Sequence, residues 1–240
     1  MLKFQHFMRE LFSKYENIYF HFKWLSIEET IKVRKELIDK IIPLPHTFYP
    51  SIKIKEREKI YSVSLISRVS PPSIIRVLGN YDSFSSRTII AKIVSKIPKS
   101  FVYLSYSGAN NIYRLPNIPI LTSYPLPFNY YLQILTGSKA SIAPISTGYD
   151  TYRYWEIPFC GAALIAQNQY TIIPNNFEHK KSALFFGSLK ELKNILEYYF
   201  LEGNEEELLR IAENGRRHLL QYHTPQHRTN YVIESIKRRI

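Results

Sequence analysis

Short apolar runs alternate with stretches of helical spacing between Tyr61 and Phe186, and this alternation limits the fold of the chain more than any other feature. The apolar runs predict five strands, at residues 61–67, 101–106, 140–144, 162–166 and 183–186. Helical periodicity occupies residues 87–97, 126–135 and 151–160 between them. Strands separated by helices favour a parallel sheet with helices on both faces, because such crossovers are right-handed. We therefore predict an α/β fold, a Rossmann-like parallel sheet of about five strands wound with helices.

Signals at helix N-termini predict a helical segment after the last strand. Ser188 and Glu191 have the spacing of a capping box, and Asn204 and Glu207 repeat it for a second helix. Thr224, followed by a proline, is the expected N-cap of a third helix.

The first sixty or so residues have a different pattern. We expect a strand within residues 18–24 and a helix within residues 26–40. Three prolines between residues 43 and 50 exclude regular structure there, because each proline removes a backbone donor and restricts its neighbour. The expected organisation is a small N-terminal appendage at residues 1–42, a linker at 43–57 and the Rossmann-like domain at 58–240.

The chain has 240 residues and a net charge of +12, and the positive charge is concentrated in one segment. Nine basic residues and one acidic residue lie within residues 59–149. Such a field concentrates anions, so phosphorylated metabolites, nucleic acid and an anionic membrane surface are candidate partners; the alternative is that the charge serves solubility. The single cysteine, Cys160, excludes an internal disulfide and a cysteine-built zinc site. The sequence contains neither a signal-peptide pattern nor an apolar run of about 18 residues, which predicts a cytoplasmic protein.

One stretch, residues 153–167, combines the features of a nucleotide-binding edge. A short helix carrying Glu156 is expected to end at Gly161, and an apolar strand follows at once. A carboxylate can accept hydrogen bonds from a vicinal diol, and unpaired amides at a helix N-terminus bind phosphates. Gly-x-Gly-x-x-Gly, Walker, Gly-x-Ser-x-Gly and His-Glu-x-x-His motifs are absent from the sequence, and its aspartates never form Asp-x-Asp. We therefore predict no metal and no resident cofactor.

The order of motifs from about residue 61 onward resembles the C-terminal, donor-binding half of GT-B glycosyltransferases of group 1, and most closely their spore-maturation-type branch. The stretch from Arg153 through Glu156 to Gly161 follows the family pattern Arg-x-x-Glu-Ala-x-Ala-Cys-Gly-Ala. Downstream, Asn214-Gly215, His223-Thr224 and Arg228 stand where the family shows Asn-Gly, His-Thr and a basic residue. The resemblance implies a nucleoside-diphosphate sugar as the donor substrate.

The resemblance also implies a role for each residue of the donor site. Glu156 would accept hydrogen bonds from the ribose hydroxyls; the alternative is a helix-surface glutamate paired with Arg153. Arg68, at the end of the first strand, would contact the donor phosphates, with Arg76 or Arg87 in place of the family's lysine. The alternative for each arginine is a solvated surface charge.

Tyr124 would pack beside the base, unless it is an ordinary loop aromatic, and Gly148 would let the backbone approach a phosphate. The predicted nucleotide-binding residues are thus Arg68, Arg87, Tyr124, Gly148, Arg153, Glu156 and Gly161.

Two departures from the family pattern concern catalysis. Retaining members carry a second glutamate eight residues before the ribose glutamate, where this chain has Gly148. Asp150 lies nearby and is expected to cap the helix that follows it. Only about sixty residues precede the donor half, too few for the family's N-terminal acceptor domain. The histidines His6, His21 and His46 are candidate bases by residue type alone, so no catalytic residue is assigned.

The sequence supports three functional hypotheses. The first is a metal-independent GT-B glycosyltransferase that transfers a sugar to an unidentified acceptor. The second is a donor-binding subunit whose acceptor site comes from a partner chain or from a second copy in a homodimer. The third is a non-catalytic basic module that binds nucleic acid, which we rank last because the sequence has no recognised nucleic-acid motif.

Overall fold

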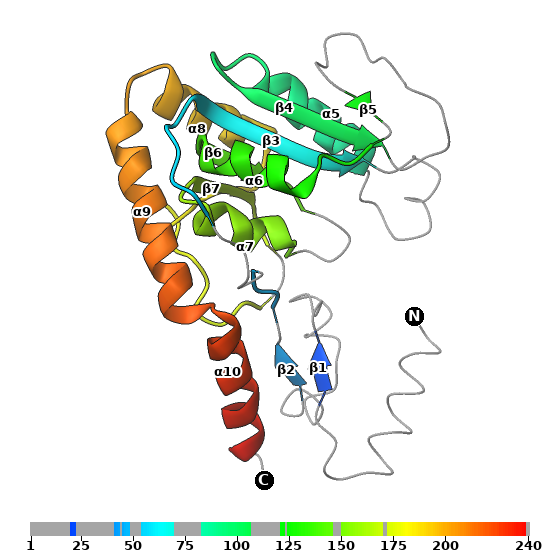
Figure 1. Cartoon of the computed structure of the whole chain (residues 1–240), viewed down its shortest axis with the longest axis vertical. Coiled ribbons are helices and arrows are strands. Elements are labelled where there is room, and N and C mark those ends of the chain that lie inside the picture. The colour runs from blue at the N-terminus through cyan, green and yellow to red at the C-terminus, as the bar shows by residue number, and fades with distance from the viewer. Residues whose placement is uncertain are drawn as a thin grey trace.

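A parallel sheet forms the centre of the protein. The computed structural model describes residues 20–22, 41–43, 45–48, 54–69, 83–106, 121–122, 124–145, 150–169 and 172–238. The sheet has six strands in the order β5-β4-β3-β6-β7-β8 (Figure 1). They are β3 (Tyr61–Val69), β4 (Phe101–Tyr106), β5 (Leu121–Thr122), β6 (Ser138–Ala143), β7 (Ala163–Gln167) and β8 (Leu184–Phe186). The predicted Rossmann-like sheet is confirmed. The additional strand, β5, is too short to leave a periodic pattern in the sequence.

The strand order reverses between β3 and β6. The chain runs outward from β3 through β4 to β5, and then returns to place β6 on the other side of β3. From there it continues through β7 to β8. The carboxyl ends of β3 and β6 therefore flank the switch point at which open α/β sheets bind ligands.

Helices cover both faces of the sheet, as predicted. The helices α5 (Ser83–Val94) and α8 (Leu189–Phe200) contribute to one core, and α6 (Phe128–Thr136) and α7 (Tyr152–Phe159) contribute to the other (Figure 1). The long helix α9 (Glu205–Tyr222) reaches both, with Leu208 in the first core and Leu219 in the second. Because neighbouring strands are parallel, each intervening helix runs back across the sheet. The N-termini of α5, α6 and α7 therefore lie at the carboxyl edge.

The capping signals of α8 and α10 (Pro225–Lys237) are confirmed. The Ser188 hydroxyl accepts a hydrogen bond from the Glu191 amide at 3.2 Å, and the Glu191 carboxylate accepts one from the Gly187 amide at 2.8 Å. The Thr224 hydroxyl accepts a hydrogen bond from the amide of His227. Both helices thus satisfy N-terminal amides with the side chains that the sequence indicated.

The second predicted capping box, at the start of α9, is wrong. Asn204 is the N-cap residue, but its side chain caps no amide and donates instead to the carbonyl of Tyr198. The Glu207 carboxylate accepts hydrogen bonds from the hydroxyls of Tyr198 and Tyr199, both at 3.1 Å. Two tertiary phenol donors therefore replace the local backbone donor that a capping box requires.

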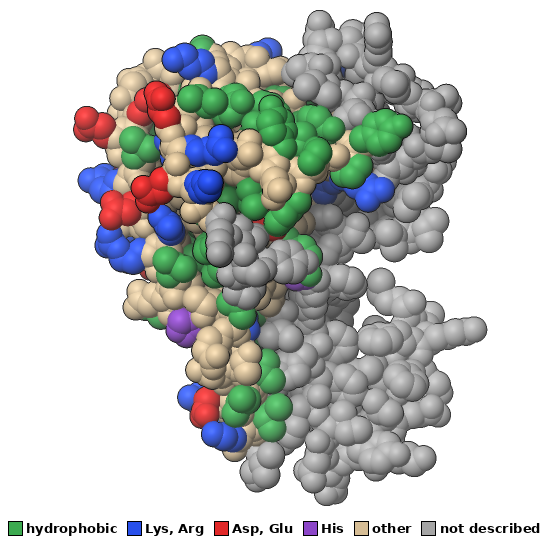
Figure 2. Space-filling view, in the orientation of Figure 1, with side chains coloured by type: hydrophobic (Ala, Val, Ile, Leu, Met, Phe, Trp, Pro, Cys, Tyr) green, Lys and Arg blue, Asp and Glu red, His purple; other side chains and the backbone are tan. Residues whose placement is uncertain are grey.

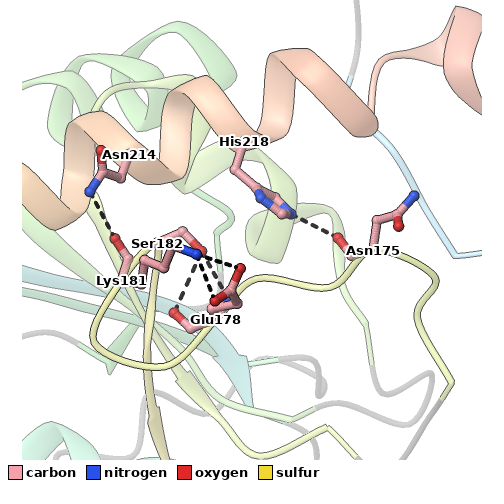
Figure 3. A network of polar contacts seen from close by, with 6 residues as sticks. All are labelled: Asn175, Glu178, Lys181, Ser182, Asn214 and His218. Atoms are coloured by element: carbon pink, nitrogen blue, oxygen red, sulfur yellow. Dashed lines mark hydrogen bonds and ion pairs between the residues drawn. The ribbon is translucent and has the colours of Figure 1, made fainter.

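A turn between β7 and β8 packs against α9 and explains the Asn214-Gly215 pair (Figure 3). The Asn214 amide donates to the carbonyl of Lys181, and the His218 ring lies 2.8 Å from the carbonyl oxygen of Asn175. A Cβ atom at Gly215 would lie 2.5 Å from the carbonyl oxygen of Ser182. Glycine is therefore required here by the close approach of two backbones.

The described N-terminal residues include a separate parallel pair of short strands, β1 (Phe20–Phe22) and β2 (Ile41–Pro43). The strand expected within residues 18–24 is confirmed, whereas the helix expected within 26–40 lies outside the described residues. Pro43 was expected in irregular structure but pairs with Phe22 as the last residue of β2. A proline is tolerated there because the end of a short strand can lose one backbone donor.

The surface differs between α9 and α6. Figure 2 shows acidic and basic side chains intermixed over α9, whereas hydrophobic side chains gather on the face that carries α6. Exposed aromatic residues in and just before α6 include Tyr124, Phe128 and Tyr130. Among the described residues, no helix is both long and apolar enough to cross a membrane.

Candidate functional site

The helix α7 ends where the sequence indicated. Gly161 has φ of +71°, and the amides of Gly161 and Ala162 donate to the carbonyls of Pro158 and Ile157. These two bonds form a Schellman motif, which ends the helix and lets β7 begin at once. Since α7 runs back from the carboxyl edge, Gly161 lies at the opposite edge of the sheet. The structure does not bring it near the other predicted nucleotide-binding residues.

Glu156 lies in the middle of α7 and is buried, with 5% of its surface exposed. Its Oε2 atom accepts a hydrogen bond of 2.6 Å from the hydroxyl of Tyr131 on α6. Burial raises the pKa of the Glu156 carboxyl, whereas the Tyr131 hydrogen bond and the Arg153 cation act in the opposite direction. The alternative of a helix-surface glutamate is therefore wrong. Tyr131 is a residue that the sequence did not reveal, because a tyrosine at helical spacing is indistinguishable from a core aromatic.

Arg153 precedes Glu156 by almost one helical turn and is half-buried. Its Nε atom is buried, and no described residue accepts a hydrogen bond from it. Buried guanidinium nitrogens are normally paired, so this one has spare hydrogen-bonding capacity. Arg153, Glu156 and Tyr131 together bring a cation, a carboxylate and a phenol to the space between α6 and α7.

Arg87 joins the two strand ends at the switch point. The side chain is buried, and its guanidinium donates to the carbonyl of Arg68 at the end of β3 and, at 2.9 Å, to that of Ile145 beyond β6. Arg68 itself is exposed. The structure therefore brings both predicted arginines to the switch point, with Arg87 holding the backbone and Arg68 facing solvent. A solvated surface charge describes Arg68 but not Arg87.

Two predicted nucleotide-binding residues, Tyr124 and Gly148, remain. Tyr124 follows β5 at the outer side of the sheet with 75% of its surface exposed, and its carbonyl accepts a hydrogen bond from the Tyr103 hydroxyl. Gly148 lies outside the described residues. Of the three candidate histidine bases, His46 stands beside α7, with its ring centroid 4.4 Å from that of Tyr152.

The expectation that Asp150 caps α7 is wrong. The N-cap residue is Thr151, whose side chain makes no capping hydrogen bond. Asp150 is buried, and its Oδ2 atom accepts hydrogen bonds from the amide of His46 at 2.6 Å and from the indole of Trp155 at 3.2 Å. The carboxylate thus binds the amide of His46 and the indole of Trp155 rather than the first amides of the helix.

A cleft of about 540 Å³ opens beyond the carboxyl ends of β7 and β8. It is lined by Asn168, Gln169, Asn176, His179, Phe185 and Glu191. Amide and carboxylate groups beside an aromatic ring suit a hydroxyl-rich ligand. The cleft shares the ligand-binding edge of the sheet with the switch point but contains none of the predicted site residues. Within the described ranges, no group of three or more His, Cys, Asp or Glu side chains could hold a metal ion.

Solved structures share this architecture at low sequence identity. They include HepE from Anabaena in complex with UDP and glucose, with a TM-score of 0.60, 14% identity, and coverage of 89% of this chain and 62% of HepE. TarM from S. aureus gives a TM-score of 0.57 and 9% identity, and the match covers 89% of this chain and 42% of TarM. A GtfA/B complex gives a TM-score of 0.52 and 13% identity, covering 82% of this chain and 40% of the matched chain. At these identities the likeness shows the fold, and this chain spans less than two thirds of each of the three.

The sequence itself places the chain in a family. No curated protein matches it. The family model described as glycosyl transferase-like matches residues 106–234, which is more than half of the chain. The match includes every element from β5 to α9 and most of α10, and it leaves out β3, α5 and all but the last residue of β4. The chain therefore belongs to the glycosyl transferase-like family.

Proposed function

We propose that this chain binds a nucleoside-diphosphate sugar and acts as the donor half of a metal-independent GT-B glycosyltransferase of the spore-maturation type. The observation that carries the proposal is the pair of residues on α7, Glu156 and Arg153, which combines a buried carboxylate with a guanidinium that has spare hydrogen-bonding capacity. Family membership and the neighbours' fold support it, and HepE was solved with UDP and glucose.

The ribose is assigned to Glu156. Tyr131 occupies Oε2 and is the only described residue that donates a hydrogen bond to this carboxylate, which leaves Oε1 to accept from the hydroxyls of a diol. Burial and the adjacent carboxylate raise the pKa of Tyr131 well above its usual value, so the phenol keeps its proton and remains a donor. The phenol thereby orients the carboxylate for the ligand.

The pyrophosphate is assigned to the carboxyl edge of the sheet. Arg68 and Arg153 supply guanidinium groups, and Arg87 adds positive charge where it holds the ends of β3 and β6. The first amides of α7 have no side-chain cap and can donate to phosphate oxygens. Gly148 and Tyr124 complete the proposed site, beside a phosphate and beside the base. Positive groups that stabilise the leaving diphosphate are the catalytic contribution of this half.

Calorimetric titration with UDP-, GDP-, ADP- and TDP-sugars tests the proposal. We expect one of these to bind, and Arg153→Ala to weaken its binding at least tenfold. Arg217→Ala is the matched control, because Arg217 is exposed on α9 and pairs only with Glu213 there. If none of the four nucleotides binds, or if both variants behave alike, the proposed function is wrong.

A partner supplying the acceptor site is a second proposal. It is supported by a neighbour that was solved as a complex, GtfA/B. Either a partner chain or a second copy in a homodimer would complete the enzyme. Sedimentation of the pure protein together with a sugar-nucleotide turnover assay tests this, and turnover by a monomer would exclude it.

A further inference from the structure

Two segments far apart in the sequence meet at the first turn of α7. The first is residues 45–48, which follow β2, and the second is the bend between α9 and α10. The Thr47 hydroxyl donates to the carbonyl of His223 at 2.6 Å, and Arg228 Nε donates to the carbonyl of His46 at 3.3 Å. The amide of His46 donates in turn to Asp150, immediately before α7. These contacts tie the linker segment and the bend both to each other and to α7.

A buried cluster of four side chains, Asp150, Trp155, His223 and Arg228, lies at this meeting point, and we call it the junction cluster. Trp155 donates to Asp150, and the guanidinium carbon of Arg228 lies 5.0 Å from the centroid of the Trp155 ring. Arg228 donates to His223 Nδ1 at 2.7 Å, because a guanidinium has no acceptor atom. The proton of the neutral imidazole must then sit on Nε2, which lies 2.7 Å from the carbonyl oxygen of Asn175. Opposite charges and directed hydrogen bonds fix the geometry of the cluster.

The junction cluster controls the rotation of α7 about its axis. Successive residues of a helix point about 100° apart, so the direction of Trp155 fixes the directions of its neighbours. Asp150 and Arg228 hold Trp155, and the Tyr154 hydroxyl donates to Asn176 at 2.6 Å. Because Tyr154 and Trp155 are fixed by these contacts, Glu156 faces α6 and accepts its hydrogen bond from Tyr131.

We propose that the junction cluster is a positioning device for the donor site. It sets the direction of Glu156 and Arg153, and it couples that direction to residues 45–48 and to the start of α10. This inference rests on the proposed function, because it assigns the cluster to the same nucleotide site. Its consequence is that loosening the linker contact weakens donor binding, although no residue of the cluster is among the proposed donor-binding residues.

The test combines nucleotide binding with hydrogen exchange in the full chain. Asp150→Asn keeps the shape of the side chain and removes its charge. We expect faster exchange at the amide of His46 and along α7, together with about tenfold weaker binding of the sugar nucleotide. Thr47→Val removes only the bond to His223 and should shift both readouts in the same direction by less, which keeps the test valid if Asp150→Asn fails to fold.

Tyr199→Phe is the matched control. It removes a hydrogen bond to Glu207 from a buried tyrosine on the other face of the sheet, and it should change neither readout. Unchanged exchange along α7 in Asp150→Asn would overturn the positioning device. Faster exchange with unchanged nucleotide affinity would overturn its role at the donor site. Failure of the wild-type protein to bind any sugar nucleotide would instead overturn the proposed function, while the exchange data would still show whether the cluster holds α7.

Discussion

The two sides of α7 bury polar groups in opposite ways. On the junction side, Asp150 accepts from two donors, and Arg228 contacts a carbonyl, an imidazole and an indole ring. On the α6 side, Glu156 accepts one hydrogen bond from the described residues, and Arg153 Nε donates none to them. A polar network with several internal hydrogen bonds makes a structure rigid, whereas a buried group with spare hydrogen-bonding capacity indicates a ligand. The helix α7, with eight residues, thus has a structural side and a proposed binding side.

The largest effect on stability should come from removing the cation of the junction cluster, Arg228. Arg228→Ala removes a buried charge and leaves Asp150 and His223 without one of their neighbours, which should lower the free energy of unfolding by about 3–5 kcal/mol. Urea denaturation measures this. Arg217→Ala, which breaks an exposed ion pair on α9, should cost less than about 1 kcal/mol. If the two variants are equally stable, the junction cluster is not the rigid side of α7.

A smaller effect is expected where α9 supports the junction side. Gly215→Ala places a methyl group 2.5 Å from the carbonyl oxygen of Ser182, so one of the two backbones must shift. Overpacking of this kind costs about 1–3 kcal/mol. Thermal unfolding should show it, with Glu213→Ala as the control because that side chain is exposed on the same helix. A wild-type melting temperature for Gly215→Ala would show that the turn at residues 175–182 is not held against α9.

The free energy of unfolding should depend on His223 as the pH falls below neutrality. Burial and the Arg228 cation lower the pKa of His223 from 6.5 to about 3. In the unfolded chain His223 takes up a proton near pH 6.5, whereas in the folded protein it does so only near pH 3. Between the two, the unfolded state binds more protons, so the free energy of unfolding falls with falling pH, by up to about 1.4 kcal/mol per pH unit.

Urea titrations between about pH 7 and pH 4 measure this slope. His223→Gln should have a shallower slope than the wild type, whatever its absolute stability. Equal slopes in the two proteins would mean that His223 takes up its proton in the folded state over this pH range.

Local signals in the sequence were sufficient for most elements of this fold, and missed the short strands β2 and β5. Gly161 ends α7 and Ser188 caps α8 because each acts on amides or carbonyls within a few residues of itself. The local signal is misleading where the side chain forms a hydrogen bond with a residue in another part of the fold instead. Asp150 binds an amide that lies 104 residues away in the sequence, and Glu207 binds two tyrosines of the preceding helix.

The candidate site was predictable in part for the same reason. The family pattern indicated Arg153 and Glu156 together, because both stand on one short helix. Tyr131 could not be found, since its contact with Glu156 spans 25 residues and depends on how α6 and α7 lie on the sheet. The role of Arg87 in joining two strand ends likewise depends on the strand order, which places β6 beside β3.

The smallest effect on stability should come from Glu156→Gln, on the binding side. Burial raises the pKa of the folded carboxyl above its usual 4.5, so the folded state binds more protons than the unfolded state just above that pH. The contribution of Glu156 to stability is therefore present below pH 4.5 and lost as the pH rises, opposite in sign to that of His223. Removing the charge should change the free energy of unfolding at neutral pH by less than about 1 kcal/mol, because one hydrogen bond is weakened while the cost of burying a carboxylate disappears.

Sugar-nucleotide affinity, in contrast, should fall at least tenfold in Glu156→Gln, because an amide replaces the carboxylate that we propose accepts hydrogen bonds from the ribose. Calorimetry and urea denaturation of the same preparation measure the two quantities together. A loss of stability as large as that of Arg228→Ala, with nucleotide affinity unchanged, would place Glu156 among the structural residues and remove the distinction between the two sides of α7. A stable variant that has lost affinity would establish that α7 is held on one side so that the other can remain open to the donor.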